Sequence, residues 1–341
     1  MSFKRYDADD FIISSDSITA TLWSTGQPTL TEFYTSSVQA AGSSGNFYLS
    51  VFQTGSTLVN STSQFEIAYG DKLGSGSSYY NSGVAYKSPS LSIYGQYRAL
   101  ILEDENKSFT FGTGNNTHVV DNFYALSIDR ARYKESIFPG SINLKLTGAD
   151  NTIHLTDNSR DVTINTFIGS SRVYQLVSGS NGSGINSPDN VSSGMVANSG
   201  SYGLVFPELG TILLNPDALS EFAGISTVRT ANSTNGANNA SLFTAINNGA
   251  SFQINSQETI TSDYIFTRAR NSEFNYTQNP TFISGSTGEV IFDNFINNPQ
   301  TYITTIGMYN DSNELLAVAK LSRPLIKDFT KEALVRVKLD F

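Results

Sequence analysis

Ser141-Ile-Asn-Leu-Lys-Leu146 and Thr152-Ile-His-Leu-Thr156, with Asp150 and Asn151 between them, decide the fold class of this chain. Apolar and polar residues alternate in both runs, which is the two-residue period of a half-buried β-strand. The Asp-Asn pair is typical of the turn that joins two antiparallel strands. We therefore predict a β-hairpin here.

The same alternation recurs in both directions from this hairpin. Further strands are predicted at 17–23, 46–53, 64–69, 97–102, 123–128, 172–177 and 202–206, mostly separated by clusters of Gly, Ser and Asn. Two short helices are expected. One begins at Pro216 after the potential N-cap Asn215, and the other covers 240–249 and ends in a capping glycine.

The C-terminal region contains the most apolar strands. Residues 300–321 form a predicted hairpin around a turn at 310–314, apolar enough for both of its faces to be buried. A last strand continues to the end of the sequence and is expected to be tied down in a sheet. Its apolar face is Val335, Val337, Leu339 and Phe341.

Length and composition favour several β modules. A chain of 341 residues exceeds what one hydrophobic core usually supports, so we predict an N-terminal module at 1–136, a middle module at 137–226 and a C-terminal docking module at 227–341. Charged residues make up only 15%, while Ser, Thr, Asn and Gly, which weaken helices, are abundant. The predicted fold class is mainly β, with several small antiparallel β-sandwich or barrel-like modules and one or two short helices.

Composition also argues against several kinds of partner. The formal net charge of -9 lacks the basic surface that nucleic acid binding requires. The absence of cysteine removes disulfides and thiolate metal sites, and fits synthesis in a reducing cytoplasm. Neither a signal peptide nor a run of about 18 apolar residues is visible, so we expect no membrane insertion.

Few residues suggest chemistry. His118 and His154 lie in separate modules without metal-ligand spacing. The acids at 7–10 and 103–105 fit solvated or ion-paired groups better than the paired carboxylates of a glycosidase. Residues 157–161 lack the Gly and the final acid of a calcium loop. We predict that the chain is not an enzyme and has no catalytic, cofactor-binding or metal-binding residues.

Other residues suggest contacts with proteins. The Gly- and Ser-rich loop around Tyr79 and Tyr80 has the composition of an ordered surface loop that pairs with another chain. Arg268 and Arg270, with Glu273 nearby, are expected to form local or intersubunit salt bridges. The other candidate contacts lie in the C-terminal strands and are Tyr302, Tyr309, Val335, Val337, Leu339 and Phe341.

Several stretches resemble virion structural proteins of myovirus-type cyanophages, which have contractile tails. In the C-terminal region these are 274–282 and 298–324, whose core, Ile306-Gly-Met-Tyr-Asn310 with Glu314-Leu-Leu-Ala-Val-Ala319, is also similar to a hairpin of various phage tail and baseplate proteins. Ser2-Phe-Lys-Arg-Tyr-Asp7 and Tyr202-Gly-Leu-Val-Phe-Pro207 resemble the same cyanophage proteins. The resemblance covers most of the chain and brings no catalytic residues with it.

The resemblance implies a structural subunit of the virion tail. The leading hypothesis is a baseplate component that contacts other tail or baseplate proteins and is present in several symmetry-related copies. The alternative is an adaptor for tail-fibre attachment or for the neck and collar, using Tyr79, Tyr80 and the loop 178–201. A third hypothesis, a tail-associated envelope hydrolase, would need a pair of acidic residues.

Overall fold

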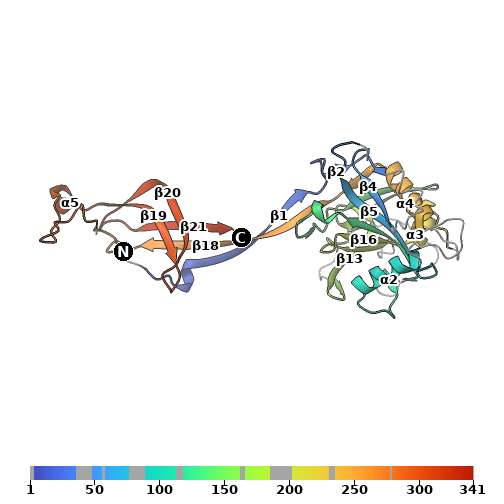
Figure 1. Ribbon diagram of the computed structural model, residues 1–341, viewed down its shortest axis with the longest axis horizontal. Coiled ribbons are helices and arrows are strands. Elements are labelled where there is room, and N and C mark those ends of the chain that lie inside the picture. Colours follow the sequence, from blue (N-terminus) through green and yellow to red (C-terminus); the bar gives the residue numbers. More distant parts are fainter. Residues whose placement is uncertain are drawn as a thin grey trace. The chain divides into compact units, whose positions relative to one another are not determined.

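The computed structural model describes residues 4–35, 48–55, 58–76, 89–112, 118–161, 166–184, 202–229, 235–276 and 279–340. It confirms the predicted fold class, because 46% of the chain is strand and 16% is helical. The contacts divide the chain into unit 1, Met1–Ser17 with Thr259–Phe341, and unit 2, Ile18–Glu258 (Figure 1). This division differs from the expected modules 1–136, 137–226 and 227–341, since strands from all three join one sheet of unit 2.

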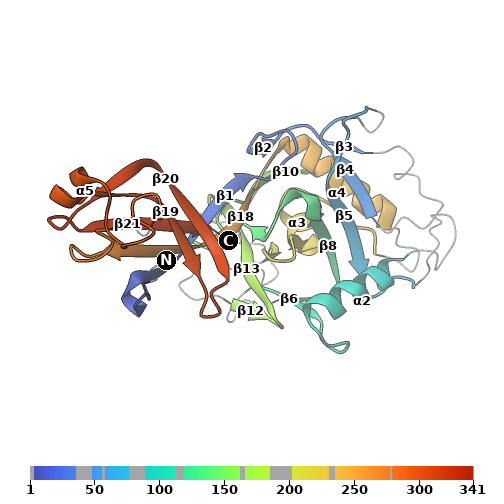
Figure 2. The same cartoon turned by 60° about the vertical axis from the view of Figure 1, so that its left-hand side comes forward.

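Unit 2 is built on a large antiparallel sheet that curls into a half-barrel (Figure 2). In spatial order its strands are β2 Thr29–Leu30, β17 Ser251–Gln253, β10 Asn143–Thr147, β11 Thr152–Asp157, β13 Ser171–Ser180, β15 Gly203–Phe206, β16 Thr211–Leu214, β8 Asn122–Ile128, β5 Ser63–Asp71, β4 Tyr48–Phe52 and β3 Tyr34–Thr35. The short strands β12 Thr166–Ile168 and β14 Ser183–Gly184 pair with β13. Outside this sheet, β6 Phe109–Phe111 pairs with β7 His118–Val120.

The hairpin predicted from the first two runs is confirmed. β10 and β11 pair antiparallel, with Leu144 opposite Leu155 and Leu146 opposite Ile153. All four side chains are buried in the larger core of unit 2. The alternation in the sequence therefore marks one face that packs on the core, as expected for a strand of this period.

Helices cover both faces of the sheet. Leu242 and Ile246 of α4 (Asn235–Gly249) and Leu219 of α3 (Pro216–Ala223) belong to one core cluster, while Ile93 and Tyr94 of α2 (Ser90–Ile101) belong to the other. Central strands contribute to both clusters: in β16, Ile212 and Leu214 face one core and Leu213 the other. Such strands are apolar without a break because both of their faces are covered.

The strand predicted at 97–102 is wrong, because these residues belong to α2. Ile93, Tyr94 and Ile101 are buried and Tyr97 packs against the same cluster, which is helical spacing rather than alternation. At Gly70 of β5, a Cβ would lie 2.8 Å from the Phe123 ring and 3.1 Å from the Tyr94 Cα. The missing side chain lets α2 approach the sheet closely.

The other two helices of unit 2, α3 and α4, agree in part with the helices predicted from the sequence. α3 begins as predicted, with Pro216 at its start and the Asn215 side chain accepting a hydrogen bond from the Asp217 N–H at 3.1 Å. α4 begins at Asn235, within the stretch expected to be a spacer. Gly249 is its last residue, and the left-handed residue after it is Ala250, with φ 50°. With α5 in unit 1, the described residues contain four α-helices, more than the one or two expected.

Unit 1 is a small two-layer β structure. One layer contains β1 (Phe11–Thr21), β18 (Asn255–Ala269) and β21 (Ala333–Asp340), and the other is the hairpin of β19 (Thr301–Tyr309) and β20 (Leu315–Lys327). The first residues of β18 belong to unit 2, and Ser256 and Gln257 pair there with β9 (Ser136–Ile137). The short helix α5 (Asp293–Asn297) and the 3-10 turns Ala8–Asp10 and Arg130–Arg132 complete the described elements.

The core between the two layers of unit 1 is small. Its buried residues are Ile265 and Val337 from one layer and Ile306 and Met308 from the other. Tyr6 packs against them, and its hydroxyl is 2.8 Å from the Thr267 hydroxyl. The Lys4 ammonium also forms a 3.0 Å ion pair with Glu273, so both contacts attach the N-terminal segment to unit 1.

Candidate functional site

The outer surface of unit 1 is unusually apolar. More than half of the large hydrophobic side chains that are exposed in the described residues lie in unit 1, although it holds less than a third of the chain. Large exposed apolar patches on a protein commonly mark contact sites for other proteins. We therefore describe its three outer surfaces in turn.

The first surface is the outer face of the β19–β20 hairpin. The hairpin and its turn at 310–314 are confirmed, but the expectation that both faces are buried is wrong for the described chain. Ile306 and Met308 face the core, whereas Leu316 is 69% and Val318 is 56% exposed. An apolar face of this kind lies in water unless another chain covers it.

The predicted contacts Tyr302 and Tyr309 both lie exposed on this hairpin. A Cβ on Gly307 would lie 3.0 Å from the Tyr309 ring and 3.4 Å from Leu315, so these two side chains lie over the glycine. Tyr302 pairs across the strands with Ile326, which is exposed as well. Apolar and aromatic side chains thus occur near both ends of the hairpin's outer face.

The predicted contacts of β21 have a different place. Val337 is buried in the core of unit 1, and Val335 and Leu339 pack against that core. Their side chains hold the unit together and are not offered to a partner. Phe341 lies outside the described residues, as do Tyr79 and Tyr80.

The second surface is the outer face of the β18–β21 pair. The cross-strand pairs Tyr264 with Lys338, Phe266 with Arg336, and Arg268 with Leu334 lie opposite the buried pair of Ile265 and Val337. Arg336 and Lys338 lie 5.4 and 5.9 Å from the Tyr264 ring centre. These three cross-strand pairs make up what we call the basic face.

The predicted salt bridges of Arg268 and Arg270 are not seen within the described residues. Glu273 pairs instead with Lys4 and accepts a hydrogen bond of 2.8 Å from the backbone N–H of Arg270. No carboxylate among the described residues lies within 4 Å of either guanidinium. Both arginines are exposed and free to pair with another molecule.

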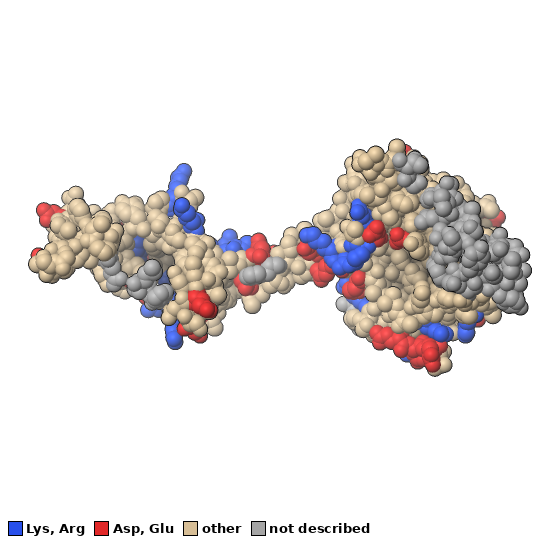
Figure 3. Space-filling view, in the orientation of Figure 1, with Lys and Arg blue, Asp and Glu red and all other residues tan. Residues whose placement is uncertain are grey.

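The third surface is the segment 279–298, which we call the tip. Its rings pack on one another, with Phe282 and Phe292 4.9 Å apart and Phe282 and Phe295 6.2 Å apart. Backbone bonds close its turn, including Ser284 N–H to Glu289 C=O at 2.8 Å. No residue of the tip is buried. In the view of Figure 3 the α5 end of unit 1 carries acidic atoms, and basic atoms begin further along the unit.

A buried lysine anchors the loop that leads into the tip. Lys327 is fully buried, and its ammonium group donates to the backbone C=O of Asn271 at 3.0 Å, the side-chain oxygen of Asn275 at 2.8 Å and the Asp328 C=O at 2.9 Å. Asn275 in turn donates to the Asn271 C=O. The three protons of the ammonium are therefore used to fix the 271–275 loop against the end of β20.

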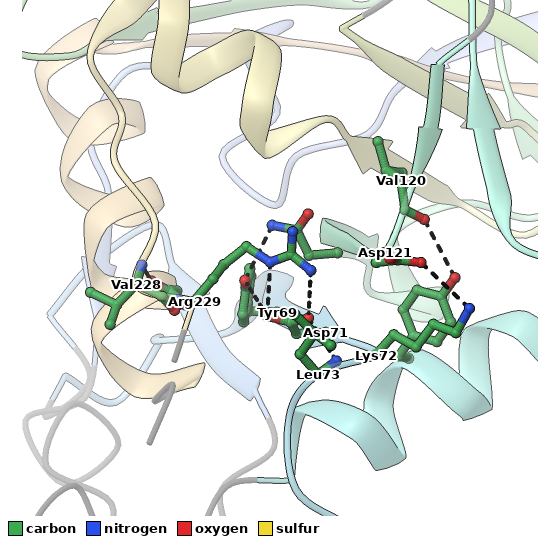
Figure 4. A network of polar contacts seen from close by, with 11 residues as sticks. Tyr69, Asp71, Lys72, Leu73, Val120, Asp121, Val228 and Arg229 are labelled. Atoms are coloured by element: carbon green, nitrogen blue, oxygen red, sulfur yellow. Dashed lines mark hydrogen bonds and ion pairs between the residues drawn. The ribbon is translucent and has the colours of Figure 1, made fainter. Parts of the chain in front are cut away.

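Unit 2 contains a buried polar network (Figure 4). Asp71 is fully buried and receives two hydrogen bonds from Arg229, at 3.0 and 3.2 Å, and one from the Tyr69 hydroxyl at 3.1 Å. The Asn122 amide donates to the same hydroxyl at 3.2 Å. Burial, and then the charge of Asp71, raise the pKa of Tyr69 far above its ordinary value. This network ties the segment after α3 to the end of β5, although the buried side-chain oxygen of Asn122 has no partner among the described residues.

The acidic and histidine residues considered from the sequence are dispersed. His118 lies 3.5 Å from Asp217, while His154 lies exposed on β11. The Asp10 carboxylate accepts a hydrogen bond from the backbone N–H of Asp7, and the Glu103 carboxylate accepts one from the Ser170 hydroxyl at 2.8 Å. Asp157 is buried and accepts from the N–H groups of Gly140 and Ser159, as a structural turn residue does. Among the described residues no three His, Asp or Glu side chains are grouped to hold a metal ion.

Comparisons with known proteins identify no relative. No family model, no curated protein and no solved structure matches this chain. Within the described residues, none of the helices has the length and apolar character needed to cross a bilayer.

Proposed function

We propose that the chain is a structural subunit of a phage contractile tail, located in the baseplate and present in several copies. The resemblance of most of the sequence to virion structural proteins of cyanophages supports the tail assignment. The observation that carries an assembly role is the uncovered apolar face of β19–β20, where Leu316 and Val318 are exposed. Assembly into a particle would cover this face with neighbouring tail proteins.

The tip and the basic face support the same proposal. They give unit 1 two further exposed surfaces of different chemistry, as expected of a subunit that contacts more than one neighbour. The contacts expected for the adaptor hypothesis, Tyr79, Tyr80 and most of 178–201, lie outside the described residues. The tests below therefore use the described surfaces of unit 1.

Deletion of 335–341, the obvious test, would not separate docking from folding. β21 pairs with β18 along its length and places Val337 in the core. A chain without it would lose part of that core, so its absence from particles would have two explanations.

The sharper test changes the outer face of the hairpin alone. We expect Leu316→Glu with Val318→Glu to leave the purified protein folded, because both side chains are exposed, and to remove it from assembled particles, because two buried charges at an interface are costly. The measurements are the circular dichroism of the protein and its amount in purified particles. Val119→Glu, on the exposed β7 of unit 2, is the matched control.

Two results would contradict the proposal. Particles that contain the double variant at the unmodified level would show that the hairpin face is not a docking surface. A particle that never contains the unmodified protein would overturn the tail assignment itself.

A further inference from the structure

Charges are segregated along the C-terminal part of unit 1. Residues 274–314 contain four acids, Glu289, Asp293, Asp311 and Glu314, and no Lys or Arg. The following residues, 315–340, contain six basic residues and three acidic ones. The fold adds Arg268 from β18 to the basic part, so one unit presents an acidic surface and a basic surface.

The tip combines this acidity with apolar side chains. Glu289 and Asp293 are exposed, and no basic residue among the described residues lies within ion-pair distance of either. Phe292 and Ile296, beside them in the sequence, are exposed by about half or more. A tip of this composition fits a partner surface that is apolar or aromatic at its centre and carries Arg or Lys side chains.

The basic face has the complementary composition. Tyr264 and Phe266 are half-buried on it, and Leu334 is exposed. Lys338 is already paired with Asp340 at 2.9 Å, whereas Arg268 and Arg336 have no carboxylate within 4 Å among the described residues. Two arginines beside aromatic rings can pair with carboxylates and also pack against an aromatic side chain.

We propose that the tip of one copy docks on the basic face of a second copy of this chain. Glu289 and Asp293 pair with Arg268 and Arg336 of the neighbour, while Phe292 and Ile296 cover its Tyr264 and Leu334. Because the two surfaces differ, each copy uses its tip on one neighbour and its basic face on another. Head-to-tail contacts of this kind close into rings or continue as filaments.

This inference rests on the proposed function, since a ring of copies is what a symmetric tail component would form. It adds the identity of one partner, a second copy of the chain, and the residues of the contact. We infer a second copy of the chain as the partner from charge complementarity. The acidic tip fits a basic, partly aromatic surface, and the basic face of the same chain is such a surface.

The test is reversal of charge on each side of the contact, in the full-length chain. We expect the unmodified protein to self-associate in analytical ultracentrifugation, and association to weaken as salt is raised. Glu289→Lys with Asp293→Lys, or Arg268→Glu with Arg336→Glu, should each weaken association at least about tenfold, since like charges then face one another. The chain with all four changes should recover it, because opposite charges face one another again.

Matched controls lie elsewhere on unit 1. Asp311→Lys, in the turn of the β19–β20 hairpin, and Lys320→Glu, on β20 of the same hairpin, each reverse one charge away from the proposed contact and should leave association unchanged. Circular dichroism of every variant checks that it is folded. If the fourfold variant does not recover association, or if the controls weaken it as much, the pairing is overturned.

The failures of the two proposals are distinguishable. A purified chain that stays monomeric at concentrations up to about 100 μM overturns head-to-tail docking even if particles contain the protein. A chain that self-associates as expected but is absent from particles overturns the tail function and leaves the contact standing.

Discussion

Lys327 is the last residue of β20, and its ammonium group is buried among three neutral oxygens. A buried charge is costly unless hydrogen bonds replace its hydration, and here each proton has an acceptor. Nothing in the run Leu325-Ile-Lys-Asp328 distinguishes this lysine from a solvated one. Two of the three acceptors, on Asn271 and Asn275, come from a loop more than fifty residues earlier, so only the fold could reveal these contacts.

We predict that Lys327→Met lowers the free energy of unfolding by about 3 kcal/mol, because it leaves buried oxygens without donors. Urea denaturation followed by circular dichroism measures the change. Lys320→Met, at an exposed position of the same strand, should change stability by less than about 0.5 kcal/mol. Equal effects of the two substitutions would show that the three hydrogen bonds contribute little.

Gly249 is a second residue whose role could not be predicted from the sequence. The sequence places a glycine correctly at the end of α4, but the reason differs from the one expected. Ala250 takes the left-handed conformation, while a Cβ on Gly249 would overlap the Lys145 carbonyl of β10. The glycine is required by close packing of helix on strand rather than by its own backbone angles.

At the scale of the element, alternation predicted strands well wherever one face is buried. β10, β11, β19 and β21 are found close to where the pattern placed them. Which face of a strand is buried was harder to predict. The exposed outer face of β20 is apolar, so its sequence resembles that of a buried face. α2 was missed since its apolar residues are close enough together to be mistaken for a short strand.

Two tyrosines on the adjacent strands β5 and β8 determine how the stability of the protein should change at high pH. Tyr69 and Tyr124 lie opposite each other on these strands, with ring centres 5.3 Å apart, and both are fully buried. Burial raises the pKa of both hydroxyls above the ordinary value of about 10. The folded state therefore holds these two protons more tightly than the unfolded state does.

We predict that the contribution of these two tyrosines to the free energy of unfolding is constant below pH 10. Above pH 10 the free energy of unfolding should fall. There the unfolded chain loses the protons and the folded chain keeps them, which costs about 1.4 kcal/mol per pH unit for each tyrosine. The last tyrosines to ionise should do so together with loss of the far-ultraviolet circular dichroism signal. Full tyrosine ionisation in a chain that keeps its native spectrum would contradict this.

At the scale of the whole molecule, the two units differ in how much apolar surface they bury. Unit 2 has two large core clusters on the faces of its sheet, whereas the core of unit 1 has four buried residues. The sequence predicted more than one module but not that Met1–Ser17 would join the C-terminal region. That grouping depends on pairing between strands far apart in the chain, which local patterns do not encode.

We predict that unit 1 unfolds before unit 2, because the free energy gained by burial grows with apolar area. Trp23, the single tryptophan, is buried in unit 2 and donates a 2.9 Å hydrogen bond to the Phe252 C=O, so its fluorescence reports on unit 2. In urea, circular dichroism should begin to fall at lower concentration than tryptophan fluorescence changes. Ile306→Ala, which removes core contacts of unit 1, should move the first transition to lower urea and leave the fluorescence transition in place. If the two signals coincide in the unmodified protein, the units unfold as one cooperative structure and the small core is stabilised by more than its own buried residues.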